Sequence, residues 1–328
     1  MKPFAYARPA DAADAVEQAS RNPAARYLAG GTNLVDLMKL RVENPDLLVD
    51  VTGLGLDKVE ESDRGLRIGA LARNSDIAVD RVVRERFPAV SQALLSGASG
   101  QLRNAATAGG NVLQRTRCAY FTDASKPCNK REPGSGCPAR TGEHHNLAIL
   151  GASEHCIATH PSDFAVALAA YDARLEVQTA DGIHDVALAD FYLPVGSSPE
   201  REVVLQHGEL ITAVVLPAPP ANARAAYRKA RERASYAFAI GSVAAVVAMD
   251  GDRVREVRVA LGAVASMPWR ARRTEDMLRG ETVSPEVIAV AADAELSAAE
   301  PLPGNAYKVP LLRELIVSTL GELTEVTR

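Results

Sequence analysis

The sequence predicts an α+β fold with two successive domains, and three observations support this prediction. First, the 328 residues are 47% hydrophobic and 24% charged, which is enough apolar material for a sizeable core. Second, strand and helix patterns alternate early in the chain, whereas its later part reads as two long strands followed by helices. Third, the stretch APPANA between these parts has two prolines and no hydrophobic period, which is typical of a boundary. We therefore expect domains at residues 1–218 and 222–328.

The first elements predict a compact β-α-β unit. FAYARP reads as a short strand, and Asp11 can cap the alanine-rich helix after it, because an aspartate side chain accepts hydrogen bonds from the first turn of a helix. A strand at Tyr27–Ala29 is followed by apolar residues at helical spacing, and LLVDV returns as a strand. The helical residues are Leu34, Leu37, Met38 and Val42.

The remainder of the first domain mixes strands and helices. LRIGAL predicts a strand, a polar segment surrounds Asn74 and Asp76, and FPAVSQALLSGA predicts a helix. A helix then begins near Ser162, and LEVQTA is a strand that enters a hairpin turn at Asp181-Gly182. The last strand, LITAVVLP, ends at Pro217.

The second domain predicts an antiparallel strand pair with helices. YAFAIGSVAAVVAM and VREVRVALGAV read as strands joined by the turn at residues 250–252. Two or three helices follow, and VPLLRELIVSTLGEL is the last of them.

Charge and hydropathy exclude two classes of partner. The formal net charge is −4 and the pI is near 5.9, so no basic surface is expected for nucleic acid. The longest nearly apolar run, Phe238–Met249, is shorter than the roughly 20 residues of a membrane-spanning helix. MKPFAYARP places proline and charged residues where a signal peptide needs an apolar segment, so we expect no export signal in this chain.

Two glycine turns point to a phosphate-bearing ligand. AGGTN follows a predicted strand and precedes a helix, yet it lacks the G-x-G-x-x-G fingerprint. Without a Cβ the backbone can approach a ligand closely, and its N–H groups favour an anion. A second turn of the same kind lies at Thr107–Asn111, so one long cofactor with two phosphates could span both. The GLG at Gly53–Gly55 lacks a third glycine and a clear helix, and we interpret it as a loop.

All four cysteines fall in one part of the chain, at Cys118, Cys128, Cys137 and Cys156. No pair has the C-x2-C spacing of a zinc ribbon or a typical ferredoxin, so two disulfides, inert thiols and an iron-sulfur cluster are all open. The loop at residues 115–145 is rich in Pro, Gly, Lys and Arg and has no apolar period, so it needs something other than a core to order it.

The surroundings of the cysteines favour a metal site over buried thiols. Basic side chains near them can offset the charge of thiolates, namely Arg115, Arg117, Lys126, Lys130 and Arg131. Two disulfides remain an alternative if the protein works in an oxidising compartment. Four histidines lie close by in the sequence, but a full set of thiols makes surface or structural roles the better interpretation than zinc; they are His144, His145, His155 and His160.

Five motifs, in this order, resemble the FAD-binding subunit of the xanthine dehydrogenase, aldehyde oxidase and carbon monoxide dehydrogenase family. They are YLAGGTNLVDLMK, QLRNAATAGGN, THPSDFAVAL, GELITAVVLP and YRKARERASYAFA, and they cover almost the whole chain. The phrases GASGQLRN, LQRTRC, PCNKR, PGSGC and HCIATHPSD are most similar to the periplasmic aldehyde oxidoreductase type within that family. The resemblance implies a two-part FAD-binding domain and a C-terminal α+β domain like that of the CO dehydrogenase flavoprotein.

The resemblance also implies a set of FAD-binding residues. The first turn would wrap the FAD pyrophosphate with Arg26, Tyr27, Leu28, Ala29, Gly30, Gly31, Thr32, Asn33 and Leu34. The second wall would be Thr107, Ala108, Gly109, Gly110 and Asn111. Asp163 would hold a ribityl or ribose hydroxyl, and Ile211 and Lys229 would lie near the flavin ring, with Arg228 as a rival to Lys229. Neither turn contains His or Cys, so we expect non-covalent FAD.

For the cysteines, the resemblance favours a 4Fe-4S cluster on all four, held by an insertion at about residues 115–156. It further implies an electron-transfer subunit with no catalytic residue of its own. Its expected partners are a 2Fe-2S subunit and a subunit with the molybdenum cofactor, in a heterotrimer carried to the periplasm by a partner's signal. The alternatives are the flavin subunit of a 4-hydroxybenzoyl-CoA reductase-like enzyme, a stand-alone flavin oxidase of the vanillyl-alcohol oxidase type, a non-enzymatic iron-sulfur scaffold, and a cytoplasmic location.

Overall fold

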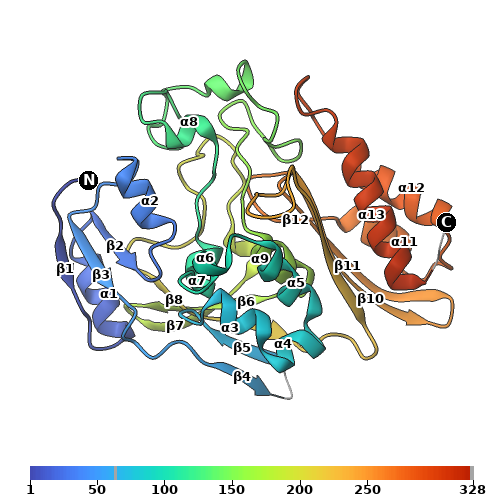
Figure 1. Ribbon diagram of the computed structural model, residues 1–328, viewed down its shortest axis with the longest axis horizontal. Coiled ribbons are helices and arrows are strands. Elements are labelled where there is room, and N and C mark those ends of the chain that lie inside the picture. Colours follow the sequence, from blue (N-terminus) through green and yellow to red (C-terminus); the bar gives the residue numbers. More distant parts are fainter. Residues whose placement is uncertain (63–64, 326–328) are drawn as a thin grey trace.

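Three sheets and the helices around them make up the protein, which a computed structural model describes for residues 1–62 and 65–325 (Figure 1). The first sheet is parallel, with the strand order β1-β3-β2. Its elements are β1 (Ala5–Ala7), α1 (Ala12–Ser20), β2 (Ala25–Leu28), α2 (Leu34–Lys39) and β3 (Leu47–Asp50). Asp11 caps α1 by accepting from the N–H of Asp14 at 2.9 Å, as the sequence predicts.

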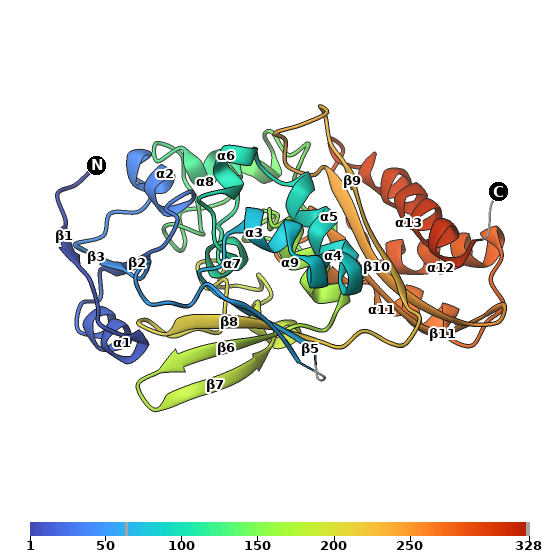
Figure 2. The ribbon, with the colours of Figure 1, turned by 60° about the horizontal axis from the view of Figure 1, so that its bottom comes forward.

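The second sheet is antiparallel and has the order β4-β5-β8-β6-β7. Its strands are β4 (Val59–Ser62), β5 (Gly65–Gly69), β6 (Arg174–Thr179), β7 (Gly182–Ala187) and β8 (Leu210–Pro217). Helices cover one face of it (Figure 2). They include α3 (Asn74–Val79), α4 (Arg81–Arg86), α5 (Pro88–Ser96), α6 (Gly100–Arg103), α7 (Ala108–Val112), α9 (Asp163–Ala170) and, beside β7, α10 (Leu188–Phe191).

The C-terminal domain is a four-stranded antiparallel sheet with three helices. The strand order is β12-β11-β10-β9, and α13 packs on β9 and β10. The elements are β9 (Arg224–Ala230), β10 (Gly241–Asp250), β11 (Arg253–Gly262), β12 (Trp269–Arg270), α11 (Arg272–Leu278), α12 (Pro285–Leu296) and α13 (Lys308–Thr324). The fold class is therefore α+β, which confirms the prediction.

The cysteine-bearing insertion lies at the top of Figure 1 and contains only α8 (Ala119–Thr122) and a 3-10 turn (Pro138–Arg140). The expectation that it cannot order itself by apolar burial is wrong. Phe121 is fully buried in a small core with Leu37, Ile157 and Val195, and Cys118 and Cys156 belong to it. Sequence pattern misses this core because its members are few and come from distant segments.

Two other expectations differ from the structure. The strand expected from Tyr236 begins only at Gly241, and residues 231–240 form a loop with exposed Tyr236 and Phe238. The polar segment around Asn74 is helix α3, whose buried face carries Ile77. The hydrophobic pattern was the only basis for predicting the secondary structure of both segments. In the folded chain, tertiary packing determines it.

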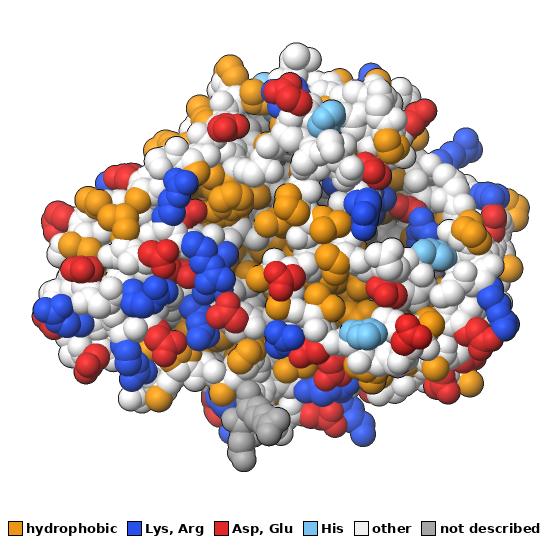
Figure 3. All heavy atoms as spheres, turned by 180° about the vertical axis from the view of Figure 1, so that it is seen from behind, with side chains coloured by type: hydrophobic (Ala, Val, Ile, Leu, Met, Phe, Trp, Pro, Cys, Tyr) orange, Lys and Arg blue, Asp and Glu red, His pale blue; other side chains and the backbone are white. Residues whose placement is uncertain are grey.

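One hydrophobic core runs across the expected domain boundary. Phe164 and Val166 of α9 share a cluster with Tyr227 of β9 and Val246 of β10. Seen from behind, the molecule mixes acidic and basic side chains over its surface, and hydrophobic side chains gather near the middle of that face (Figure 3). Within the described part of the chain, every helix is too short or too polar to cross a bilayer.

Candidate functional site

A cavity of about 800 Å³ opens where the two domains meet. Its walls come from the turn before α2, helices α5 to α7, the N-terminus of α9, the β9–β10 loop and the end of β11. Both predicted glycine turns reach it. The sequence-predicted residues that line it are Gly31, Thr32, Asn33, Gly110, Asn111, Asp163 and Lys229.

The first glycine turn presents its backbone to this cavity. Gly31 has φ +71°, a left-handed conformation that favours glycine. Among the described residues, the backbone N–H groups of Gly31, Thr32 and Asn33 have no hydrogen-bond acceptor. The Asn33 side chain accepts from the N–H of Arg115 at 3.0 Å and so ties this turn to the segment that follows the second one. A row of free N–H groups favours an anionic ligand.

Gly30 packs closely against the segment that precedes the second turn. A Cβ at this position would lie 1.9 Å from the carbonyl oxygen of Ala105, so glycine is required for close packing of the two turn segments. Gly110, by contrast, lines the cavity and would meet only the Thr107 hydroxyl, at 3.1 Å. We therefore expect Gly30→Val to disrupt the packing of these two segments.

Buried polar atoms without partners gather in the cavity wall. Eight such side-chain atoms occur in the described residues, and five of them belong to residues that line the cavity: Asn33, Asn74, Arg117, His160 and Ser242. Buried polar groups are normally hydrogen-bonded, so an enrichment at one place favours a site for a polar ligand. Five cations and three carboxylates also line it, which favours an anion; the cations are Lys39, Arg103, Arg117, Lys229 and Arg233.

Lys229 and Asp163 form a buried ion pair on the cavity wall. The Lys229 Nζ lies 2.7 Å from Asp163 Oδ2 and also donates to the Ser96 carbonyl at 3.1 Å. The Tyr227 hydroxyl donates to the other Asp163 oxygen. Neighbouring residues of a strand point to opposite faces. Arg228 accordingly pairs with Glu322 on α13, so Lys229 is the cation that faces the cavity.

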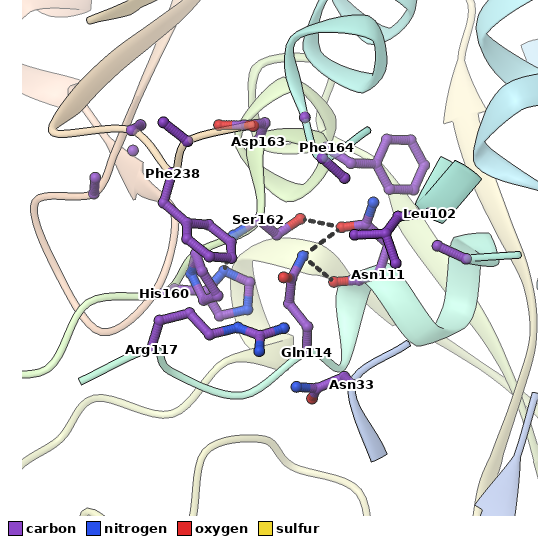
Figure 4. A pocket seen from close by; sticks show the side chains of 18 of the residues that line it. Asn33, Leu102, Asn111, Gln114, Arg117, His160, Ser162, Asp163, Phe164 and Phe238 are labelled. Atoms are coloured by element: carbon purple, nitrogen blue, oxygen red, sulfur yellow. Dashed lines mark hydrogen bonds between the residues drawn. The ribbon is translucent and has the colours of Figure 1, made fainter. Parts of the chain in front are cut away.

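A chain of hydrogen bonds orders the second turn (Figure 4). Ser162 donates to the Asn111 side-chain oxygen at 2.7 Å, and Gln114 donates to the same oxygen at 2.7 Å. Ser162 also caps α9 by accepting from the N–H of Ala165 at 2.9 Å. His160 lies beside this chain, and burial lowers its pKa to about 4, so its imidazole is neutral near pH 7.

The other predicted FAD residues do not line the cavity and have contacts elsewhere in the fold. Arg26 pairs with Glu43, and the Tyr27 hydroxyl donates to the Gly208 carbonyl at 2.5 Å, away from the cavity. Gly109 donates to the Ala70 carbonyl at 2.8 Å, and Ile211 lies in the main core. The same applies to Leu28, Ala29, Gly30, Leu34, Thr107 and Ala108, which do not line the cavity. Four further residues line the cavity and were not predicted to do so from the sequence, namely Arg103, Arg117, His160 and Phe238. Their spacing in the sequence does not distinguish them from other polar and aromatic residues.

The four cysteines line one small second pocket. They are free of disulfides, and Thr116, Asn129 and Lys130 lie in the same wall. Cys118 is close enough to Cys128 and Cys137 for their charges to interact, and Cys156 likewise to Cys137 and Cys118. The four histidines do not join them as a set. His144 bonds to Gly142 and Gly304, and His145 stacks on Tyr307.

The pocket does not have the geometry of a single-ion site. No three His, Cys, Asp or Glu side chains of residues 1–62 and 65–325 come close enough to hold one metal ion. The cavity among the four cysteines is small, about 10 Å³. Burial raises the pKa of Cys118, and that of Cys156 to about 11, so both side chains are neutral thiols near pH 7 in the absence of a bound cation.

A partly buried charge network extends from this pocket through Arg115 to Glu43. Lys130 donates to Glu202 at 2.8 Å and to the Pro199 carbonyl at 2.8 Å. Arg115 pairs with Glu202 and with Glu43, each at 2.6 Å. Most of the basic side chains expected around the thiols thus face carboxylates or carbonyls. Among them, Lys130 lies close enough to Cys156 to favour its thiolate.

The size, free N–H groups and excess cations of the cavity are therefore typical of a site for a large anionic cofactor, and a pocket lined by four cysteines lies beside it. Residues 2–219 match the family described as the FAD binding domain in molybdopterin dehydrogenase, and residues 225–323 match the CO dehydrogenase flavoprotein C-terminal domain. The chain belongs to the FAD-binding subunits of the xanthine dehydrogenase and CO dehydrogenase family, and this confirms the resemblance carried by the five motifs. It is an oxidoreductase subunit with an FAD-binding domain.

Individual relatives agree with this assignment. The chain is 50% identical over 324 residues to the aldehyde oxidoreductase FAD-binding subunit PaoB of Escherichia coli (strain K12), with 98% of each chain covered. It is 26% identical to the glyceraldehyde dehydrogenase medium chain of Sulfolobus acidocaldarius, over 87% of this chain and 84% of the relative. The carbon monoxide dehydrogenase structure from Hydrogenophaga pseudoflava shares the fold, with a TM-score of 0.77, 24% identity and 98% coverage of both chains.

Proposed function

We propose that this chain is the FAD-binding electron-transfer subunit of a molybdenum-containing aldehyde oxidoreductase. The observation that carries the proposal is the cavity, where two glycine turns, free N–H groups and unpartnered buried polar atoms meet excess cations. The choice of an aldehyde as the substrate of the complex is supported by the 50% identity to an aldehyde oxidoreductase subunit over nearly the whole chain.

The residues present fit FAD. The N–H groups at Gly31 to Asn33 and the cations of the wall would hold the pyrophosphate, and the Asp163 carboxylate would accept from a ribityl or ribose hydroxyl. Lys229 would place a positive charge near the flavin ring, where it favours the anionic reduced form. FAD supplies the step between one-electron and two-electron chemistry. A direct test is to measure FAD in the purified chain and in a Lys229→Met variant.

We further propose two partners, a 2Fe-2S subunit and a subunit with the molybdenum cofactor, in a heterotrimer. This chain would take electrons from the 2Fe-2S clusters and pass them to an acceptor. The isolated chain should then turn over no aldehyde, whereas the co-purified complex should. Aldehyde oxidation by this polypeptide alone would refute the assignment. The complex is proposed to be periplasmic through a partner's export signal, and finding it only in the cytosolic fraction would refute that location.

Finally, we propose that Cys118, Cys128, Cys137 and Cys156 hold a 4Fe-4S cluster. Its support is that the four free thiols line one pocket, with Lys130 beside them. The test is iron, acid-labile sulfide and free thiols on the anaerobically purified chain. We expect about four irons per chain, following the four thiolate ligands of this cluster type. Two disulfides and no iron would refute the cluster and leave the FAD proposal intact.

A further inference from the structure

Each glycine turn contributes one asparagine to the cavity wall, and hydrogen bonds fix the orientation of both side-chain amides. In the first turn, the backbone N–H of Arg115 donates to Asn33 Oδ1 at 3.0 Å. Because a backbone N–H can only donate, the atom that faces Arg115 is the amide oxygen of Asn33. The Asn33 Nδ2 is buried and has no hydrogen-bond partner, so the amide keeps a free NH2 donor in the cavity wall.

In the second turn, Gln114 orients the amide of Asn111 in the same way. The Gln114 Nε2 donates to the backbone carbonyl of Asn111 at 3.2 Å and to Asn111 Oδ1 at 2.7 Å (Figure 4). A backbone carbonyl can only accept, so Gln114 must present its NH2 here and Asn111 its side-chain oxygen. The Ser162 hydroxyl donates to the same oxygen at 2.7 Å. Among the residues that the structure describes, Asn111 Nδ2 has no acceptor.

The two orienting residues are neighbours in the chain, so one short segment acts on both turns. Its position is fixed by Arg115, whose side chain pairs with Glu43 and Glu202, each at 2.6 Å. The guanidinium also lies 4.6 Å from the ring centre of Phe121, in the insertion core. Two NH2 groups thus remain without acceptors in the wall of one cavity. A donor in that state costs free energy, which a ligand with acceptor oxygens removes.

We propose that Gln114 is a positioning residue for FAD. It holds the Asn111 amide so that Nδ2 donates to an acceptor oxygen of the cofactor, and the Arg115 N–H does the same for Asn33. An amide turned by half a rotation would present its oxygen to a phosphate, and the two would repel each other. This inference rests on the proposed binding of FAD in the cavity. Because Gln114 acts through Asn111, the effect of replacing Gln114 must depend on the presence of Asn111.

The experiment is a double-mutant cycle on the full chain, with FAD affinity measured by quenching of flavin fluorescence after bound flavin is removed. Gln114→Met should weaken FAD binding about tenfold, as the loss of one hydrogen bond does. In the Asn111→Ala background the same substitution should change the affinity by less than about twofold, because the amide that Gln114 positions is gone. Gln101→Met is the matched control and should leave the affinity unchanged, since Gln101 is exposed on α6 and does not line the cavity.

A second measurement does not require Gln114→Met to fold. Asn33→Asp and Asn111→Asp keep the oxygen that accepts within the protein and replace the NH2 group by a second oxygen. The free energy of unfolding of the apo chain should change little, whereas FAD affinity should fall by at least about tenfold.

Two outcomes would overturn the inference and leave the proposed function standing. One is an equal loss of affinity from Gln114→Met with and without Asn111, and the other is full FAD affinity in the two aspartate variants. A folded wild-type chain that binds no FAD would overturn the proposed function itself.

Discussion

At the scale of single residues, some glycines of the two turns are required for packing between segments, whereas others face the cavity. Gly30 is needed because the Ala105 backbone lies against it, whereas Gly110 faces the cavity. Both belong to Gly-Gly pairs in the sequence, so their roles could not be separated there. Only the position of the neighbouring segment distinguishes them.

Gly110→Val should remove FAD without unfolding the chain. The new side chain would project into the cavity mouth beside Thr107, where the backbone is exposed. The matched control is Gly100→Val, since Gly100 is also exposed, starts α6 and has no atom within 4 Å of a Cβ. Flavin absorbance and urea unfolding of both variants provide the measurement. Full FAD in Gly110→Val would contradict the placement of the cofactor at this turn.

Lys229→Met should destabilise the apo chain by about 3 kcal/mol, because it leaves the Asp163 carboxylate buried without its ion partner. Arg228→Met serves as the control. Its side chain is half exposed and pairs on the surface with Glu322, so a change of less than about 1 kcal/mol is expected. Urea unfolding measures both variants. Equal changes in the free energy of unfolding would show that the buried ion pair contributes no more to stability than the surface pair.

At the scale of elements, helix α13 is anchored to the insertion through a buried lysine. Lys308 is fully buried at the start of α13 and donates to the carbonyls of Leu147 at 3.0 Å and Ala263 at 2.8 Å. Burial lowers the pKa of Lys308 from 10.5 to about 7. Between these two values the unfolded chain binds more protons than the folded chain, so the stability contribution of Lys308 increases with pH.

The test compares wild type with Lys308→Met by urea unfolding between pH 7 and pH 10. The free energy of unfolding of wild type minus that of the variant should increase by up to about 1.4 kcal/mol per pH unit. A difference that stays flat over this range would show that Lys308 keeps its ordinary pKa in the folded chain.

Local signals in the sequence predicted many elements but not the surfaces they form together. The Asp11 cap, the β-α-β unit, the hairpin at Asp181-Gly182 and the strand ending at Pro217 follow from short-range chemistry, and the structure has them. Lys229 and Asp163 were placed near one cofactor by resemblance, and the structure joins them in one ion pair. The insertion core around Phe121 and the hydrogen bond from Arg115 to Asn33 depend on contacts between distant segments, which no spacing encodes.

At the scale of the whole molecule, the cavity is built by both domains, and a hydrophobic core crosses their boundary. A ligand that binds only the folded form stabilises all the parts that contact it. We therefore expect bound FAD to slow proteolysis of both domains together. Limited proteolysis of holo and apo chain, with fragments identified by mass, is the measurement. Protection confined to one domain would contradict a site between the two.

The most direct test of the account is the flavin content of the purified full chain after acid precipitation. One FAD per chain, released into the supernatant, is the predicted result, because neither glycine turn offers a His or Cys for covalent attachment. Flavin that stays with the precipitated protein would contradict non-covalent binding. A folded chain that neither contains FAD nor takes it up on incubation would contradict the central assignment of the cavity.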